Sequence, residues 1–167
     1  MYTISKNHVG EGCASEFFKI NNSKRGFKQF PCKESAEIAH ANQTKLAELG
    51  FAPRVYSEVG KVRIGKGKKL SRWGYITEVA QLICCPGNSC YCCDREETED
   101  IYAEEIDNLV CNMSDAGWSF GDCHAGNVGY VRRGGRKVMV CIDTGDESVQ
   151  GDDCYCITCR KGGCCHE

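Results

Sequence analysis

Two aspartates and an asparagine in the second half of the chain have the chemistry to bind a hard cation. Asp122 and Asn127 belong to a polar, glycine-rich stretch, and Asp143 follows a run of apolar, largely β-branched residues. Carboxylate and amide oxygens are ligands that Mg²⁺ accepts, usually together with the phosphate oxygens of a nucleotide. These residue types therefore indicate magnesium-assisted phosphate chemistry if the fold brings them together.

A β-hairpin is expected to bring the three residues together. Residues 128–131 and 137–142 are rich in β-branched side chains, and Arg132-Arg133-Gly134-Gly135 between them is typical of a hairpin turn. An antiparallel hairpin returns the chain to the end at which it started. We therefore predict that Asp143 lies beside Asp122 and Asn127.

The first 80 residues predict a five-stranded sheet and one helix. The helix is expected at Glu34–Leu49, where apolar residues recur at helical spacing before Gly50. Strands are expected at residues 2–9, 15–20, 27–30, 55–59 and 73–80, and a solvated basic hairpin at 60–69. Lys28 lies between Phe27 and Phe30 in the third strand, where a solvated lysine is the usual outcome.

A second helix is expected at Glu96–Asp115, with an apolar stripe that predicts core packing. Its members are Ile106, Leu109, Val110 and Met113. The net charge of −2 makes nucleic acid an unlikely partner, and no apolar run approaches the roughly 20 residues that cross a bilayer. The first residues do not read as an export signal, so we expect a cytoplasmic protein.

Fifteen cysteines are the anomaly of this composition. Without an export signal they favour metal binding or reduced thiols over disulfides. The candidate zinc ligands form two clusters: Cys84, Cys85, Cys90, Cys92 and Cys93, and then Cys154, Cys156, Cys159, Cys164, Cys165 and His166. Their spacing matches no clean zinc knuckle, and surface thiols without metal are the alternative. Cys13, Cys32, Cys111, Cys123 and Cys141 are expected to be apolar core fillers.

The order of these parts resembles the protein kinase-like fold. A glycine turn, a strand lysine, a helix, two strands and a helix precede D-x-x-x-x-N and a hairpin that ends in aspartate. The loop Asp122–Asn127, DCHAGN, is similar to the G-D-x-H-x-x-N loop of aminoglycoside and choline kinases, and to small phage-encoded relatives of serine/threonine kinases. Asp143-Thr144-Gly145 stands where protein kinases carry D-F-G.

The resemblance implies an α+β protein with a truncated kinase-like fold. Residues 1–80 would form the N-terminal nucleotide-binding lobe and residues 81–95 a cysteine-rich insert. Residues 96–147 would form a minimal C-terminal lobe, and residues 148–167 a cysteine-rich tail. The tail stands where kinases continue for many helices, so one or two structural zinc ions or a second subunit are expected to complete the lobe.

Within the nucleotide-binding lobe, the resemblance implies contacts to ATP. Gly10 and Gly12 would let backbone amides cover the phosphates, although a plain hairpin turn is the commoner meaning of Gly-x-Gly. Lys28 would pair with the α- and β-phosphates. The connection from Glu78 to Ala80 would bind adenine through backbone groups.

In the second lobe, the resemblance implies catalysis by Asp122, which would orient the acceptor hydroxyl or take its proton. Asn127 and Asp143 would hold magnesium. His124 would steady the loop by a hydrogen bond, and a purely structural role for it is equally open. The acceptor would be a hydroxyl of a protein or a small molecule.

Two departures from the family pattern keep a second class of function open. Glu37 lies earlier in its helix than the acid that pairs with the kinase lysine, and Asn42 and Gln43 lie at the better depth but carry no charge. The helices that shape the acceptor site have no counterpart. The alternative is therefore a weakly active or inactive kinase-like module that acts by binding a partner. A zinc-ribbon nucleic-acid binder is a weaker third reading.

Overall fold

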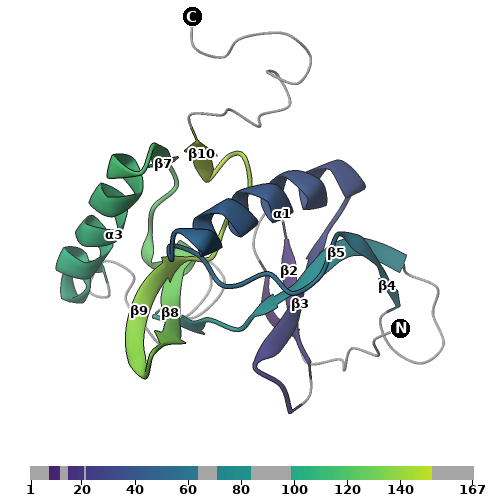
Figure 1. Cartoon of the computed structure of the whole chain (residues 1–167). Helices are drawn as coiled ribbons and strands as arrows, with labels where there is room; N and C mark the ends of the chain where they lie inside the picture. The colour runs from purple at the N-terminus through teal and green to yellow at the C-terminus, as the bar shows by residue number, and fades with distance from the viewer. Residues whose placement is uncertain (1–7, 12–14, 21, 64–70, 84–98, 152–167) are drawn as a thin grey trace, which may run out of the picture.

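We describe a computed structural model of the chain, covering residues 8–11, 15–20, 22–63, 71–83 and 99–151 (Figure 1). The fold is mixed α+β, as the sequence predicts. The strands are β1 (His8–Glu11), β2 (Glu16–Lys19), β3 (Arg25–Phe30), β4 (Gly60–Arg63), β5 (Ser71–Glu78), β6 (Gln81–Leu82), β7 (Trp118–Phe120), β8 (Val128–Arg133), β9 (Arg136–Cys141) and β10 (Val149–Gly151). The helices are α1 (Lys33–Glu48), α3 (Ala103–Asp115) and the 3₁₀ turn η1 (Ala125–Asn127).

The five-stranded sheet has the order β1-β2-β3-β5-β4, with every neighbouring pair antiparallel. The prediction of a strand at 55–59 was wrong, because Val55 makes only an isolated bridge to Thr77. Ser57 Oγ accepts the Ile76 N–H at 2.9 Å, a proton that a partner strand's carbonyl would otherwise take. The fourth strand is β4, which lies in the stretch predicted to be a solvated hairpin.

Helix α1 packs against both halves of the protein, which are the five-stranded sheet and the part of the fold from β6 to β10 (Figure 1). Ala36 and Ala39 in its first half are buried with Phe30 and Tyr75 of the five-stranded sheet. Leu46 in its second half belongs to the core formed with α3 and the strands that follow. The helix thus spans the two cores and is placed to connect them.

Two cysteines predicted to fill the core are exposed instead. Cys32 is the N-cap of α1, and its Sγ accepts a hydrogen bond from Ser35 N at 3.4 Å. Cys111 lies on the exposed side of α3. The apolar stripe of α3 has the position predicted for it, with Leu109 and Met113 buried. The helix itself begins at Ala103, later than the predicted Glu96, and residues 99–101 form a separate helical stretch before it.

The second half of the fold contains a three-stranded sheet, β6-β8-β9, and a two-stranded sheet, β10-β7. The β8–β9 hairpin is the predicted one, and it turns at Gly134 and Gly135, both with positive φ. Strands β6, β7 and β10 were not predicted, and β6 falls within the segment 81–95. Along the described ranges, no helix is long and apolar enough to cross a membrane.

We expect Gly74 in β5 to tolerate no side chain. A Cβ there would lie 2.1 Å from the carbonyl oxygen of Lys28 and 2.7 Å from Phe27 Cζ, so β3 and β5 would have to move apart. Gly74→Ala should lower the free energy of unfolding by about 3 kcal/mol in urea titrations.

The matched control for this substitution is Gly60→Ala. Gly60 is the cross-strand neighbour of Gly74, and a Cβ there would meet no atom within 4 Å. Its free energy of unfolding should stay within about 1 kcal/mol of the wild type. Equal losses in the two variants would show that the close approach of β3 to β5 does not limit residue 74.

Candidate functional site

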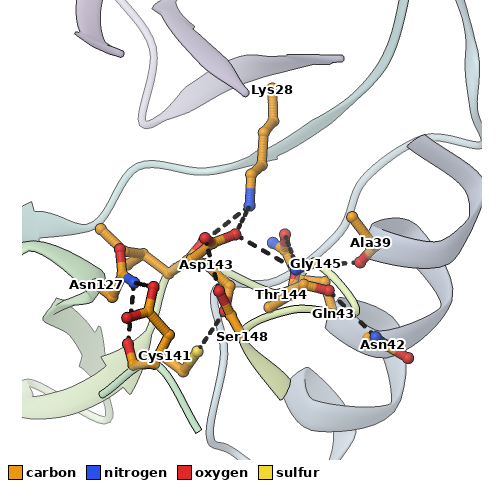
Figure 2. A network of polar contacts seen from close by, with 12 residues as sticks. Lys28, Ala39, Asn42, Gln43, Asn127, Cys141, Asp143, Thr144, Gly145 and Ser148 are labelled. Atoms are coloured by element: carbon orange, nitrogen blue, oxygen red, sulfur yellow. Dashed lines mark hydrogen bonds and ion pairs between the residues drawn. The ribbon is translucent and has the colours of Figure 1, made fainter. Parts of the chain in front are cut away.

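Lys28 and Asp143, 115 residues apart in sequence, meet between the five-stranded sheet and the β8–β9 hairpin (Figure 2). The Lys28 Nζ lies 3.7 Å from Asp143 Oδ1 and donates a hydrogen bond to the Ile142 carbonyl at 2.9 Å. The Lys28 side chain is 7% exposed and that of Asp143 is 29% exposed. The solvated position that is usual for a strand lysine, the alternative to a site role for Lys28, is therefore not the one found.

The Asp143 carboxylate is held by three donors. Ser148 Oγ donates to Oδ2 at 2.8 Å, the Gly145 N–H donates to Oδ1 at 3.3 Å, and the Lys28 ammonium lies beside Oδ1. Burial opposes ionisation of Asp143, but the charge of Lys28 and the bonds from Ser148 and Gly145 outweigh it and lower the pKa of the carboxyl below its usual value. Asp143 is consequently ionised at neutral pH.

The loop from Asp122 to Asn127 is a second polar group, organised by its own side chains. Asn127 Nδ2 donates to the Asp122 carbonyl at 3.0 Å and to Asp122 Oδ2 at 2.9 Å. His124 Nδ1 accepts the Gly126 N–H at 3.0 Å, so a neutral His124 carries its proton on Nε2, 3.7 Å from Asp122 Oδ2. The hydrogen bond from the Gly126 N–H to His124 is the kind of contact by which His124 was predicted to steady this loop.

Backbone bonds connect the two polar groups. The Ile142 N–H donates to the Asn127 carbonyl at 2.9 Å, where the β8–β9 hairpin closes. The Gly121 N–H donates to the Ser148 carbonyl at 3.0 Å, where β7 pairs with β10. The hairpin thus places Asp143 next to Asn127, and strand β10 ties the far side of Asp143 to the start of the Asp122 loop.

Helix α1 contributes no acid to Lys28. Glu37 forms an ion pair with Lys33 at 2.8 Å, on the exposed side of the helix. Asn42 and Gln43 are buried, and both lie against Thr144 (Figure 2). The carboxylate that pairs with Lys28 is therefore Asp143 itself.

Comparison with known proteins does not place the chain in a family. No protein-family model matches it, and neither does any curated protein. What the site can do has to be inferred from its own geometry.

Gly10 lies inside β1, opposite Phe17 of β2, at an irregularity of the strand pairing. This position is compatible with a bend at the sheet edge. Gly12 lies outside the described residues. The predicted cover over the phosphates therefore rests on the sequence alone.

The segment from Glu78 to Ala80 joins the two halves of the fold. The Glu78 N–H donates to the Arg54 carbonyl at 2.8 Å, and its carboxylate forms an ion pair with Arg133 at 2.8 Å. Ala80 follows the end of β5 and lies beside Gly129 of β8. Because the Glu78 N–H already donates to the Arg54 carbonyl, an adenine bound here would have to use other backbone groups of this segment.

The cysteine clusters predicted to bind zinc lie outside the described residues, as does Cys13. Among the residues described, no group of three or more His, Cys, Asp or Glu side chains could hold a metal ion. Cys141 is buried as predicted, and its thiol donates to the Asp143 carbonyl at 2.8 Å. Cys123 is half-buried, and burial raises its pKa to about 11. Neither thiol is a nucleophile at neutral pH.

The oxygen ligands near Asp143 fit a hard cation whose remaining ligands come from water and from a bound nucleotide. Asp143 is ionised, Asn127 offers an amide oxygen, and the Lys28 ammonium supplies the charge that a phosphate group would meet. Magnesium characteristically takes one or two protein carboxylates and completes its shell with water and phosphate oxygens. The residues present are enough for magnesium that arrives with a nucleotide.

Ser148 is the site residue that sequence reasoning missed. It was assigned to the cysteine-rich tail, but it is buried and donates to Asp143. The short strand that places it, β10, has three residues and no alternating pattern to reveal it.

Proposed function

We propose that the protein is an ATP- and magnesium-dependent phosphotransferase of the protein kinase-like type. It would transfer the γ-phosphoryl group to a hydroxyl, with serine or threonine of a protein favoured over a small molecule. The observation that carries the proposal is the 3.7 Å approach of Lys28 Nζ to Asp143 Oδ1, made by a strand of one sheet and the end of a hairpin in another. An ammonium beside an ionised carboxylate is the arrangement that phosphoryl transfer uses to hold phosphates and metal together.

Each residue of the site has a role that its geometry supports. Lys28 would turn its ammonium from the Ile142 carbonyl to the α- and β-phosphates. Asp143 and Asn127 would hold Mg²⁺, which neutralises charge on the β- and γ-phosphate oxygens. Asp122, whose side chain is 57% exposed, is accessible to an acceptor hydroxyl and would orient it or take its proton.

The Asp122 loop is preorganised for this role. Asn127 Nδ2 holds Asp122 Oδ2, so one carboxylate oxygen is fixed while the exposed side chain can still meet an acceptor. His124, bonded to Gly126 N, keeps the loop turned. The phosphates would be covered by backbone near Gly10 and the base contacted near Ala80. Function in the cytoplasm, that of the host cell if the protein is phage-encoded, is part of the same proposal.

Replacement of Asp122 by asparagine should slow phosphoryl transfer while leaving nucleotide binding intact. Without a carboxylate to orient the hydroxyl or take its proton, the rate should fall about 10²-fold. The measurement is transfer from labelled ATP, as autophosphorylation or to a mixed-protein acceptor. Thermal stabilisation by ATP and Mg²⁺ should match the wild type. A variant as active as the wild type would remove Asp122 from the mechanism.

A kinase-like binding module without catalysis is the second candidate. Lys28 is buried, and its Nζ already donates to the Ile142 carbonyl, so the Lys28–Asp143 pair is satisfied without a nucleotide. In this reading the pair only fastens the sheet to the hairpin, and a protein partner would bind elsewhere. Thermal-shift titration separates a nucleotide-binding protein from an inert scaffold, because stabilisation by a specific ligand grows with the logarithm of its concentration. A flat response to MgATP would favour the binding module.

A further inference from the structure

Thr144, the residue directly after Asp143, is fully buried against helix α1 (Figure 2). Its Oγ1 donates to the Ala39 carbonyl at 3.1 Å and lies 3.5 Å from Gln43 Oε1. Its carbonyl accepts a hydrogen bond from Asn42 Nδ2 at 3.2 Å. We call Thr144 with Ala39, Asn42 and Gln43 the Thr144 latch.

The helix side of the latch is anchored to the five-stranded sheet. Tyr75 OH donates to Gln43 Oε1 at 2.8 Å, and Gln43 Nε2 donates to the Pro53 carbonyl at 2.9 Å and to Thr77 Oγ1. Gln43 and Tyr75 are fully buried, and burial raises the pKa of Tyr75, so its hydroxyl stays a donor. The amide of Gln43 therefore has a fixed orientation.

The latch fixes the backbone on one side of Asp143. The Thr144 carbonyl and the Gly145 N–H belong to the same planar peptide unit. The bond from Asn42 to that carbonyl therefore also fixes the direction of the Gly145 N–H, which donates to Asp143 Oδ1. On the other side, Ile142 is held by its amide, which donates to the Asn127 carbonyl at 2.9 Å. The Asp143 carboxylate then points between Lys28 and Ser148 because the chain before and after it is fixed.

We propose that Thr144 is a positioning residue through which α1 orients the Asp143 carboxylate. The helix acts on the metal-holding aspartate through uncharged hydrogen bonds, and not on Lys28 through an acid. This inference rests on the proposed function for the meaning of Asp143. The latch itself can be tested without a nucleotide.

The first measurement is hydrogen exchange of the Gly145 amide in the ligand-free protein. That amide donates to Asp143 Oδ1 at 3.3 Å, so its exchange reports whether the carboxylate stays in place. Thr144→Val removes the hydroxyl and keeps the shape, and should speed Gly145 exchange about tenfold. Thr144→Ser keeps the hydroxyl and should leave Gly145 exchange near the wild-type rate relative to amides in the middle of α1.

Asn42→Ala is the second variant, and it decides the matter if Thr144→Val does not fold. It removes the donor to the Thr144 carbonyl and leaves Thr144 unchanged, and it too should speed Gly145 exchange relative to α1. Wild-type exchange at Gly145 in Thr144→Val, or in Asn42→Ala where the first does not fold, would overturn the latch.

The second measurement separates the latch from the proposed function. In Thr144→Val, the Mg²⁺ concentration for half-maximal stabilisation by ATP should rise about tenfold, with no such rise in Thr144→Ser. A purely structural Thr144 would lower stability and leave this concentration unchanged, which would overturn the positioning role. If MgATP fails to stabilise the wild type, the proposed function fails, and Gly145 exchange alone decides the latch.

Discussion

Asp143→Asn should abolish phosphoryl transfer and also destabilise the fold. The asparagine fills the same volume but offers one neutral oxygen, so a metal loses its charged ligand, and a loss of several kcal/mol corresponds to at least about 10³-fold in rate. Lys28, 7% exposed, loses its ion pair at the same time. Because Asp143 is partly exposed, this loss should cost about 2 kcal/mol of unfolding free energy, less than a fully buried pair would.

The control for this substitution is Glu147→Gln, which removes an exposed acid four residues away. Activity and stability should stay near wild type there. Labelled-ATP transfer measures the first effect and urea unfolding the second. Should Asp143→Asn lose stability but keep full transfer, Asp143 would be a structural partner of Lys28 and the magnesium role would be wrong.

The centre of the candidate site was predictable because it depends on local structure. Valine-rich strands around a Gly-Gly turn specify a hairpin, and a hairpin's two ends must meet. The Ile142–Asn127 backbone bond is the direct result of that geometry. The pairing of Asp122 with Asn127 needed only the four-residue segment between them.

The contacts across the fold were not predictable, since they depend on which elements pack together. Thr144 has no local pattern that marks it as buried, and its partners lie more than 100 residues away in α1. The sequence alone does not choose among Glu37, Asn42 and Gln43 as partners of Lys28, because helical spacing does not say which turn of the helix faces which loop. The strand predicted at 55–59 does not form beyond one bridge, and the side chain of Ser57 accepts the Ile76 N–H that a strand carbonyl would otherwise accept.

Lys28→Met should reduce phosphoryl transfer about 10³-fold, because under the proposed function the site loses the ammonium that would meet the α- and β-phosphates. Methionine keeps most of the apolar stem but removes the ammonium, which lies 5.5 Å from the centre of the Phe30 ring. Lys19→Met is the control, since Lys19 is an exposed lysine on the neighbouring strand β2. A transfer rate in Lys28→Met close to that of the control would exclude Lys28 from phosphate binding.

The same substitution should change how stability depends on pH. In the wild type the folded-state pKa of Asp143 is below its unfolded value, so the stabilisation is present above the unfolded pKa, about 3.9, and is lost as pH falls through the folded pKa. In Lys28→Met, burial remains and the main opposing charge is gone, so the folded pKa of Asp143 must rise. Stability at neutral pH should then be lower, and less of it should be lost on acidification below about pH 4.

Urea unfolding at a series of pH values measures this difference between wild type and Lys28→Met. Other carboxyl groups titrate in both proteins, so only the difference between the two curves belongs to the Lys28–Asp143 pair. The difference should shrink as pH falls, and this pH dependence should be absent when Asp143→Asn is present in both proteins. Parallel curves would mean that the two side chains, though 3.7 Å apart, are not coupled. Lys28 would then be held by the Ile142 carbonyl alone, and its charge would not stabilise the Asp143 carboxylate.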